Sequence, residues 1–333
     1  MDKQMKTYIG IDIGGTKLLI GELDASGGIL RHRRYRTGFG SQQQAVQILL
    51  QALEDYIRNV GFIGTPAAAG AGVVGVTDHA NGIWLAMDHI RSSPTPLAQI
   101  ISNKLGIPAA IDNDVRCATT AELVLGYGRE TKNFIYMNVG TGIAAGFVSE
   151  GRLIRGQNNN SGEIGHMVVD YDSEIPCACG RFGCIEAIAS GSGFTNRANA
   201  LIKNTNTALS LPKDGEGVDI AEIFRLADEG DELCGRLTRE AADALASGIM
   251  NLVRVTDPDV FILGGGIVSD GWMLPRIRER LNKAAMRGVR HGIVISKFDP
   301  EYTALIGAGA IAMTCSGLPE GEENEADYYA LGT

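Results

Sequence analysis

Two stretches of similar plan decide the fold, namely GIDIGGTKLLIGEL at residues 10–23 and MNVGTGIAAGFVSEG at residues 137–151. Each predicts an apolar strand, a turn of Gly and Thr, and a second apolar strand. Residues 41–60 carry apolar residues at helical spacing after a Ser that can cap a helix. Strands and helices that alternate in this way predict an α/β fold. The repeated plan predicts two related lobes that face each other across a cleft.

The length and composition fit two globular domains. The chain has 333 residues, of which 44% are apolar and 21% charged, and a typical domain has about 150 residues. We expect a smaller N-terminal α/β domain at residues 1–115, completed by a C-terminal helix at residues 303–315, and a larger one at residues 116–302. Residues 316–333 are acidic and rich in turn residues, which predicts a loosely ordered tail.

Charge and hydropathy exclude several classes of function. The formal net charge is -9 and the sequence pI is about 5.1, whereas nucleic-acid binding needs patches of Lys and Arg. We interpret the basic run RHRRYR at residues 31–36 as a solvated strand. The sequence shows neither a secretory signal nor a run of about 18 apolar residues that could span a membrane. We therefore expect a cytoplasmic protein, whose six cysteines are thiols or metal ligands.

The first glycine turn has the residue types of a phosphate-binding loop. A strand delivers Asp12 into Gly14, Gly15, Thr16 and Lys17. Glycines permit positive φ angles and let backbone N–H groups approach an anion closely, the Thr hydroxyl is a donor, and the Lys adds charge. Asp12 can hold Mg²⁺ through the waters of the ion. The alternative is a tight β-hairpin in which the Asp is incidental.

The second half of the chain repeats this plan. Its turn after Asn138 supplies glycine N–H groups and the hydroxyl of Thr141, and a later glycine turn ends a strand and could pack against a nucleoside. The glycines expected to contact the nucleotide here are Gly140, Gly142, Gly265 and Gly266. The sequence contains no G-x-x-x-x-G-K-[ST], and no G-x-G-x-x-G opens a helix after the first strand. Two phosphate turns, one from each lobe, therefore predict a nucleotide site outside those two classes.

An acid stands where an apolar strand stops. IPAAIDND places Asn113 and Asp114 at the start of a predicted helix. Asn and Asp are favoured helix caps, since they accept hydrogen bonds from the first N–H groups of the helix. They are equally suited to accept the proton of a substrate hydroxyl in phosphoryl transfer, which needs positioning, a base and charge neutralisation. Both interpretations remain open from these residues alone, and the two phosphate turns favour the second.

GEIGHMVVDYDSEIPCACGRFGC, at residues 162–184, brings a histidine and three cysteines together. His166 precedes Cys177, Cys179 and Cys184, whose spacing is C-x-C-x₄-C. His and Cys are the ligands that zinc prefers, so the pattern indicates a metal site. Buried, reduced cysteines are the alternative. The cysteines without such spacing, which we expect to be packed thiols, are Cys117, Cys234 and Cys315.

Six motifs resemble, in order, those of the ROK sugar kinases: IDIGGTK, IDND before a helix, NVGTGIAAG, GEIGH, CACGRFGCIEAIASG and ILGGGI. The resemblance covers residues 7–313, and GEIGH with the cysteine block is its most specific part. It implies an actin/hexokinase-like fold, in which two ribonuclease-H-like α/β domains close over ATP and a sugar. It also implies a homodimer or homotetramer.

The resemblance further implies roles for individual residues. Asp114 is expected to be the catalytic base that takes the proton of the sugar's primary hydroxyl. The expected sugar-binding residues are Gly75, Asn113, Asp114, Glu163, His166 and Glu186. The expected ATP phosphate contacts are Gly14, Gly15, Thr16, Gly140 and Thr141. The expected structural zinc has four protein ligands and no position open for water, and these ligands are His166, Cys177, Cys179 and Cys184. A metal-bound imidazole keeps a second N–H, so His166 could serve both zinc and sugar.

One loop departs from the family pattern and leaves the sugar open. The family's first-lobe loop reads G-x-P-G, whereas this chain has GVVG, with Val74 in place of the proline and Gly75 retained. Asp88, His89 and Arg91 occupy the region of a missing Asn-Leu-Pro segment. We expect ATP- and Mg²⁺-dependent phosphorylation of the 6-hydroxyl of glucose or a related aldohexose such as mannose. N-acetylmannosamine, fructose and allose are alternative substrates.

Two non-enzymatic alternatives follow from the same family. Its repressors carry a DNA-binding winged helix before the kinase-like body, and here the first phosphate strand starts at about Thr7, so we expect no nucleic-acid partner. A sugar sensor without catalysis is expected to lack Asp114 or the phosphate turns, and all are present. The sequence therefore favours a kinase.

Overall fold

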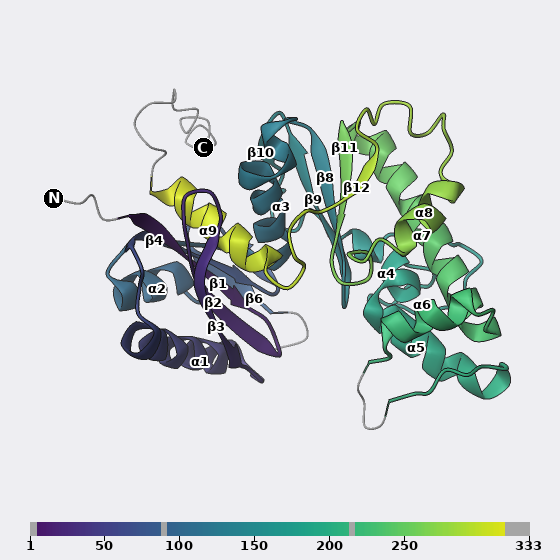
Figure 1. The fold of residues 1–333 in the computed structure, drawn as a ribbon, viewed down its shortest axis with the longest axis horizontal. Helices are drawn as coiled ribbons and strands as arrows, with labels where there is room; N and C mark the ends of the chain where they lie inside the picture. Colours follow the sequence, from purple (N-terminus) through teal and green to yellow (C-terminus); the bar gives the residue numbers. More distant parts are fainter. Residues whose placement is uncertain (1–4, 88–91, 213–216, 317–333) are drawn as a thin grey trace. The chain divides into compact units, whose positions relative to one another are not determined.

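A computed structural model describes residues 5–87, 92–212 and 217–316 of the chain (Figure 1). The chain divides into two compact units. Unit 1 comprises Met1–Arg129 and Tyr302–Thr333, and unit 2 comprises Glu130–Glu301. Asp88, His89, Arg91 and the acidic tail from residue 317 lie outside the described residues, so the predictions made for them stay predictions.

Unit 1 is built on a five-stranded sheet in the order β3-β2-β1-β4-β7. The strands are β1 (Lys6–Ile13), β2 (Lys17–Leu23), β3 (Ile29–Arg36), β4 (Thr65–Val73) and β7 (Ala109–Asn113). The first three form antiparallel neighbours, and β1, β4 and β7 run parallel. β3 is the edge strand of this order. The side chains of Arg31, Arg33 and Arg34 on it are exposed, as expected for a solvated strand.

Unit 2 repeats this sheet. Its order is β10-β9-β8-β11-β12, with β8 (Phe134–Val139), β9 (Ile143–Ser149), β10 (Arg152–Leu153), β11 (Val260–Gly264) and β12 (Ile293–Ile295). The first three strands in sequence are again antiparallel neighbours, and β8, β11 and β12 are parallel. The two units therefore share one strand order and one set of pairings, which confirms the pair of related α/β lobes predicted from the repeated motif.

Helices cover both faces of the sheet in unit 1. On one face, Ile9 and Ile11 of β1 pack with residues of α1 (Gln42–Asp55) and α2 (Leu97–Leu105). The opposite face of β1, which alternation assigns to Tyr8, Gly10 and Asp12, packs against α9 (Thr303–Cys315). α3 (Asp114–Leu125) lies beside α9. A short hairpin of β5 (Val76–Asp78) and β6 (Ile83–Ala86) completes the unit.

The small residues of β4 and α9 let these elements approach closely. A Cβ built on Gly70 would lie 1.9 Å from the carbonyl oxygen of Ala308, and one on Gly307 would lie 1.8 Å from that of Cys117. Because α9 packs this tightly on α3, residues 116–129 belong to unit 1. The division therefore falls after Arg129, later than the position 115 expected from the sequence.

Among the described residues of unit 2, the α-helices pack with the sheet around one large core. They are α4 (Ile185–Ala189), α5 (Gly191–Leu201), α6 (Ile220–Asp228), α7 (Glu232–Thr256) and α8 (Met273–Arg280). The segment between β10 and α4 contains the short 3₁₀ turn η3 (Ile164–His166) and the three clustered cysteines. Among the residues that the structure describes, no helix combines the length and apolar character needed to cross a bilayer.

Candidate functional site

The first candidate phosphate loop joins β1 to β2 in unit 1. The N–H of Gly14 donates to the carbonyl of Lys17 (2.9 Å), and the hydroxyl of Thr37 donates to the carbonyl of Gly14 (3.0 Å). Gly15 and Thr16 are exposed at the tip, and a Cβ on Gly15 would meet no atom within 4 Å. The loop therefore offers open backbone and a hydroxyl to an anion. Neither glycine has a positive φ, so glycine serves here to keep the tip open.

An acidic pair lies beside this loop. Asp12 is buried near the end of β1, with 7% of its surface exposed. Burial raises the pKa of Asp12 to about 7, with a smaller contribution from the negative charge of Asp114 and an opposing one from Lys17. The two carboxylates are thus close enough to perturb each other electrostatically. Such a pair favours a divalent cation, whose hard charge prefers oxygen ligands.

Asn113 and Asp114 occupy the junction of β7 and α3. The Oδ1 of Asn113 accepts from the N–H groups of Val115 (3.0 Å) and Arg116 (3.4 Å), so Asn113 is the helix cap. Asp114 is the first helical residue and is partly exposed; its Oδ1 accepts from the N–H of Val115 (2.9 Å). The capping interpretation therefore holds for Asn113. Asp114 stands next to this cap and is partly exposed to solvent.

Gly75 supports this junction from the neighbouring hairpin. Its carbonyl accepts from the Nδ2 of Asn113 (3.0 Å). Its φ is +88°, and a Cβ there would lie 2.2 Å from the carbonyl oxygen of Ala86. Only glycine fits such a position without strain. Gly75 thus positions Asn113 through its backbone.

The second candidate phosphate loop joins β8 to β9 in unit 2. Its own turn is closed by the N–H of Gly140, which donates to the carbonyl of Gly142 (3.0 Å). The start of α5 is tied to it, because Gly191 and Ser192 donate their N–H groups to the carbonyls of Gly140 (2.8 Å) and Thr141 (3.1 Å). The positive end of the α5 helix dipole therefore lies at this loop, where it favours an anion.

A cavity of about 780 Å³ opens at this loop. Gly140, Thr141 and Gly266 line it, and a Cβ on Gly266 would meet no atom within 4 Å. Gly265 does not line the cavity; its φ is +91° and it packs on the backbone of Val139, so it shapes the turn. The volume is within the range of about 300–1,000 Å³ found for small-molecule sites. The loop, the helix start and the open glycines fit a nucleotide.

Sequence reasoning missed the contribution of α5 to this cavity. Ser192, Thr195 and Asn196 of this helix also line it. The run SGSG at residues 190–193 carried the signal, since Ser190 caps α5 by accepting from the N–H of Gly193 (3.0 Å). A Ser in the cap position marks a helix N-terminus, and such ends are ready anion sites.

Glu186 lies directly behind the second loop. Its Oε2 accepts from the N–H of Ile143 (2.8 Å), and a Cβ on Gly142 would lie 2.7 Å from that oxygen. A Cβ on Gly165, in the GEIGH stretch, would lie 2.9 Å from the same atom. Glu186 therefore packs between the loop and η3. Glu163 stands before η3 and is exposed, so the three predicted sugar ligands of unit 2 come from neighbouring segments.

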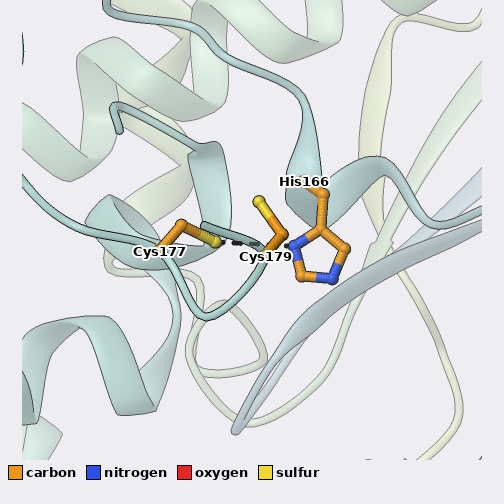
Figure 2. Close-up of side chains that lie close together, drawn as sticks. All are labelled: His166, Cys177 and Cys179. Carbon is orange, nitrogen blue, oxygen red and sulfur yellow. Dashed lines mark hydrogen bonds between the residues drawn. The ribbon is translucent and has the colours of Figure 1, made fainter. Parts of the chain in front are cut away.

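The predicted zinc ligands converge in unit 2. The ligand atoms of His166, Cys177 and Cys179 all lie within 4.8 Å of one another. Figure 2 shows these three side chains close together. The Sγ of Cys177 is 3.5 Å from the Nδ1 of His166, and the Sγ of Cys179 is 3.7 Å from that of Cys184. Tetrahedral zinc with Zn–S bonds of about 2.3 Å places its ligand atoms about 3.5–3.8 Å apart. The converging group itself comprises His166, Cys177 and Cys179, and the Sγ of Cys184 lies beside that of Cys179, so the donor set is compatible with a zinc site.

The thiols of this cluster have unlike environments. Hydrogen bonds from Arg181 lower the pKa of Cys179 to about 6, whereas burial raises the pKa of Cys184 to about 12. Zinc binds thiolates, so metal binding at Cys184 has to release a proton. Outside the cluster, Cys117 and Cys234 are buried as predicted, but Cys315 is exposed because it lies in the last turn of α9.

Comparisons with known proteins agree on one family. The model described as the ROK family matches residues 8–314. The chain is 28% identical to a glucokinase of Halalkalibacterium halodurans, over 86% of this chain and 88% of the relative. It is 25% identical to a xylose repressor of Caldicellulosiruptor bescii, over 96% of this chain and 80% of the relative.

A comparison with solved structures shows that the fold is similar as well. The structure resembles that of a ROK family glucokinase from Streptomyces griseus in complex with glucose and AMPPNP. The TM-score is 0.73 and the identity 29%, and the match covers 92% of this chain and 99% of that one. This likeness confirms the predicted fold class of two ribonuclease-H-like, actin/hexokinase-type α/β domains.

Proposed function

The chain belongs to the ROK family, and from this premise we propose that it is an ATP- and Mg²⁺-dependent kinase that phosphorylates the 6-hydroxyl of a hexose. The glucokinases among its relatives support a sugar kinase. Glucose or a related aldohexose is the proposed substrate, and N-acetylmannosamine, fructose and allose are the alternatives.

The observation that carries the proposal is the acidic pair of unit 1. Asp114 is partly exposed, starts a helix and lies close enough to Asp12 to raise its pKa. Asp114 is the proposed base that accepts the proton of the sugar hydroxyl. Asp12 is the proposed outer partner of Mg²⁺, held through the waters of the ion. The partly exposed Asp114 would thus act on the substrate, and the buried Asp12 would act on the metal ion through water.

The glycine loops of the two units are the proposed phosphate contacts. Bound ATP supplies the phosphoryl group, and Mg²⁺ neutralises part of its charge. In unit 1, Gly15 and Thr16 would donate N–H and hydroxyl groups to phosphate oxygens, while Gly14, whose N–H closes the turn, would let the phosphate approach the backbone. In unit 2, Thr141 would donate with help from the N-terminus of α5, and Gly140, whose N–H also closes its turn, would again allow close approach. Such fixed donors stabilise charge that develops in the transition state.

Unit 2 is proposed to supply hydrogen-bond acceptors for the sugar. Glu163 and Glu186 would accept from sugar hydroxyls, since charged acceptors make the stronger hydrogen bonds. His166 would use its Nε2 for the sugar if its Nδ1 binds zinc, because Nδ1 is the nitrogen that faces Cys177. Zinc in this role is structural: it fixes the segment that carries Glu163 relative to the one that leads to Glu186. We also propose a homodimer or homotetramer.

A non-catalytic regulator of the same family is the second candidate, and the xylose repressor relative is the observation that favours it. A sensor would bind sugar without using Asp114 as a base. The kinase is preferred because the acidic pair and both phosphate loops are present together in this chain.

A coupled ATP-consumption assay against hexoses and N-acetylhexosamines tests the proposal, with zinc content measured on the same preparation. Turnover with at least one sugar is the expected result. Sugar binding without turnover, by zinc-loaded and folded protein, would replace the kinase with the sensor.

A further inference from the structure

A separate cavity of about 790 Å³ lies in unit 2, between the cysteine segment and helices α4, α5 and α7. It shares only Asn196 with the cavity at the second phosphate loop. Its volume is again within the range of about 300–1,000 Å³ of small-molecule sites. None of the predicted site residues lines it. The cavity therefore has no task in the proposed kinase reaction.

A buried arginine gives the cavity an unsatisfied donor. Arg197 of α5 lines it with only 4% of its side chain exposed. Two of its nitrogens are engaged: one donates to the carbonyl of Ile188 (2.7 Å) and another binds the carboxylate of Glu240. Its Nε is buried without a hydrogen-bond partner. Buried polar groups are almost always satisfied by protein, water or ligand, so this arginine points to a ligand that brings an acceptor.

The charges around the cavity select against an anion. Five carboxylates and two guanidinium groups line it, a formal balance of -3. The second guanidinium, that of Arg236, already donates to Glu240 (2.9 Å), which it shares with Arg197. The exposed carboxylates of Asp170 and Asp172 also line the cavity. A phosphate or carboxylate would meet like charge there, while a simple cation would leave the arginine Nε without an acceptor.

We propose that this cavity binds a neutral saccharide of one or two rings as an effector, at a site distinct from the kinase site. Hydroxyl groups both donate and accept, so they can satisfy the Arg197 donor and the carboxylate acceptors at once. The aliphatic side chains of Ile188, Leu201 and Ala244 line the same cavity. They suit the apolar face of a sugar ring, since pockets combine apolar walls with a few placed polar groups.

Helix α5 connects this cavity to the second phosphate loop. Arg197, Ala200 and Leu201 on its later turns face the effector cavity, while its first residues hold the carbonyls of Gly140 and Thr141. Arg197 also holds the carbonyl of Ile188 in α4, the helix that carries Glu186. A saccharide that fixes Arg197 would therefore alter the affinity for nucleotide, and by linkage the nucleotide would alter the affinity for the saccharide.

Isothermal titration calorimetry on the full chain tests the proposal with glucose, mannose, N-acetylmannosamine and maltose, each with and without AMPPNP. Ala200→Trp fills the cavity from an exposed position on α5. Asn199→Trp is the matched control, because Asn199 is its exposed neighbour and does not line the cavity. We expect Ala200→Trp to lose one equivalent of a bound saccharide, or to bind it at least tenfold more weakly, while Asn199→Trp matches wild type.

The difference between the two variants does not depend on the kinase proposal, because turnover is measured separately and a sugar in the kinase site contributes equally to both. Identical binding by both variants, or no saccharide binding sensitive to Ala200→Trp, overturns the site. Binding of glucose 6-phosphate that Ala200→Trp abolishes overturns the charge argument. A changed oligomeric mass in Ala200→Trp without a change in saccharide binding assigns the cavity to a second copy of the chain instead. Saccharide binding that leaves the AMPPNP affinity unchanged overturns the coupling.

Discussion

β1 and β8 hold equivalent places in the two sheets but carry different polar residues at the same point. Asp12 pairs with Gly72 of β4, and Asn138 pairs with Gly264 of β11. Each residue stands one position before the end of its strand and ahead of a glycine turn. The same strand and glycine turn thus carry a carboxylic acid in unit 1 and a neutral amide in unit 2. The same framework can serve cation and proton chemistry in one copy and anion binding in the other.

The supports of the two turns differ as well. In unit 1 the turn is held by the hydroxyl of Thr37, the residue that follows β3. In unit 2 the turn is backed by a carboxylate, that of Glu186, and by the start of α5. Glu186 in turn follows the cysteine cluster by two residues. The segment between β10 and α4 therefore supports the loop of unit 2, and the site chemistry of that unit depends on it.

The largest expected effect is that of Asp114→Asn, which removes the proposed base of unit 1. The cap of this helix, Asn113, is untouched, and Asn at position 114 keeps a side-chain oxygen that can accept from the N–H of Val115, so we expect an unchanged melting temperature. Turnover should fall by about 10²–10⁴-fold, the range for losing a general base, and sugar binding should persist. Steady-state kinetics and calorimetry on the same preparation check this.

Asp219→Asn is the matched control, since Asp219 caps α6 in unit 2 by accepting from the N–H of Ala221 (2.9 Å). Its kcat should equal that of wild type. An Asp114→Asn protein with wild-type turnover would show that the acid is only part of a helix start.

Asp12→Asn gives unit 1 the residue that unit 2 carries at the same place. If Asp12 holds Mg²⁺ through its waters, we expect turnover to fall by about 10–100-fold, as for other outer partners of a metal, and the Mg²⁺ concentration needed for half-maximal rate to rise. A Mg²⁺ titration of kcat is the measurement. A wild-type Mg²⁺ response would remove Asp12 from the proposed metal site.

The same substitution should remove the contribution of Asp12 to the pH dependence of stability. Burial raises the pKa of Asp12 from 3.8 to about 7, so between these values the folded protein holds a proton that the unfolded chain releases. Stability therefore falls as pH rises through this window, by at most about 4 kcal/mol. Without Mg²⁺, Asp12→Asn should match wild type at pH 4 and be more stable at pH 8. Urea unfolding at both pH values checks this, and parallel pH profiles would contradict it.

Cys179→Ala tests whether the support of unit 2 depends on zinc. We expect the protein to lose its zinc and to melt several degrees lower, since each kcal/mol lost lowers Tm by roughly 2–4 °C in a domain of 150–250 residues. Cys315→Ala is the control, because Cys315 is exposed in unit 1 and lies outside the cluster. Zinc content and thermal unfolding are measured together. A Cys179→Ala protein that keeps one zinc and full activity would refute the structural role.

The sequence predicted what local pattern determines. The motif repeat predicted two related lobes, and the spacing C-x-C-x₄-C predicted the convergence of His166 with Cys177 and Cys179, because both signals lie in short stretches. It did not predict that α3 joins unit 1, since this depends on the close packing of Gly307 on Cys117, residues 190 positions apart. Nor did it predict α5 at the second phosphate loop or the cavity at Arg197. Both arise where segments far apart in sequence meet.

The smallest expected effects are those of a Gly→Ala substitution in each of the two glycine turns. The two substitutions should differ, because the turn of unit 1 has an open tip and the turn of unit 2 packs against Glu186. A Cβ on Gly15 meets no atom within 4 Å, whereas one on Gly142 lies 2.7 Å from the Oε2 of Glu186. Gly142→Ala must displace that carboxylate from the N–H of Ile143, which should cost about 1–3 kcal/mol of stability. Gly15→Ala should change stability by less than about 0.5 kcal/mol and raise the KM for ATP, because its methyl group occupies the open tip where we place a phosphate. Thermal unfolding and ATP kinetics of both variants decide the matter: an unchanged KM in Gly15→Ala would mean that the tip of the first loop is open to solvent alone.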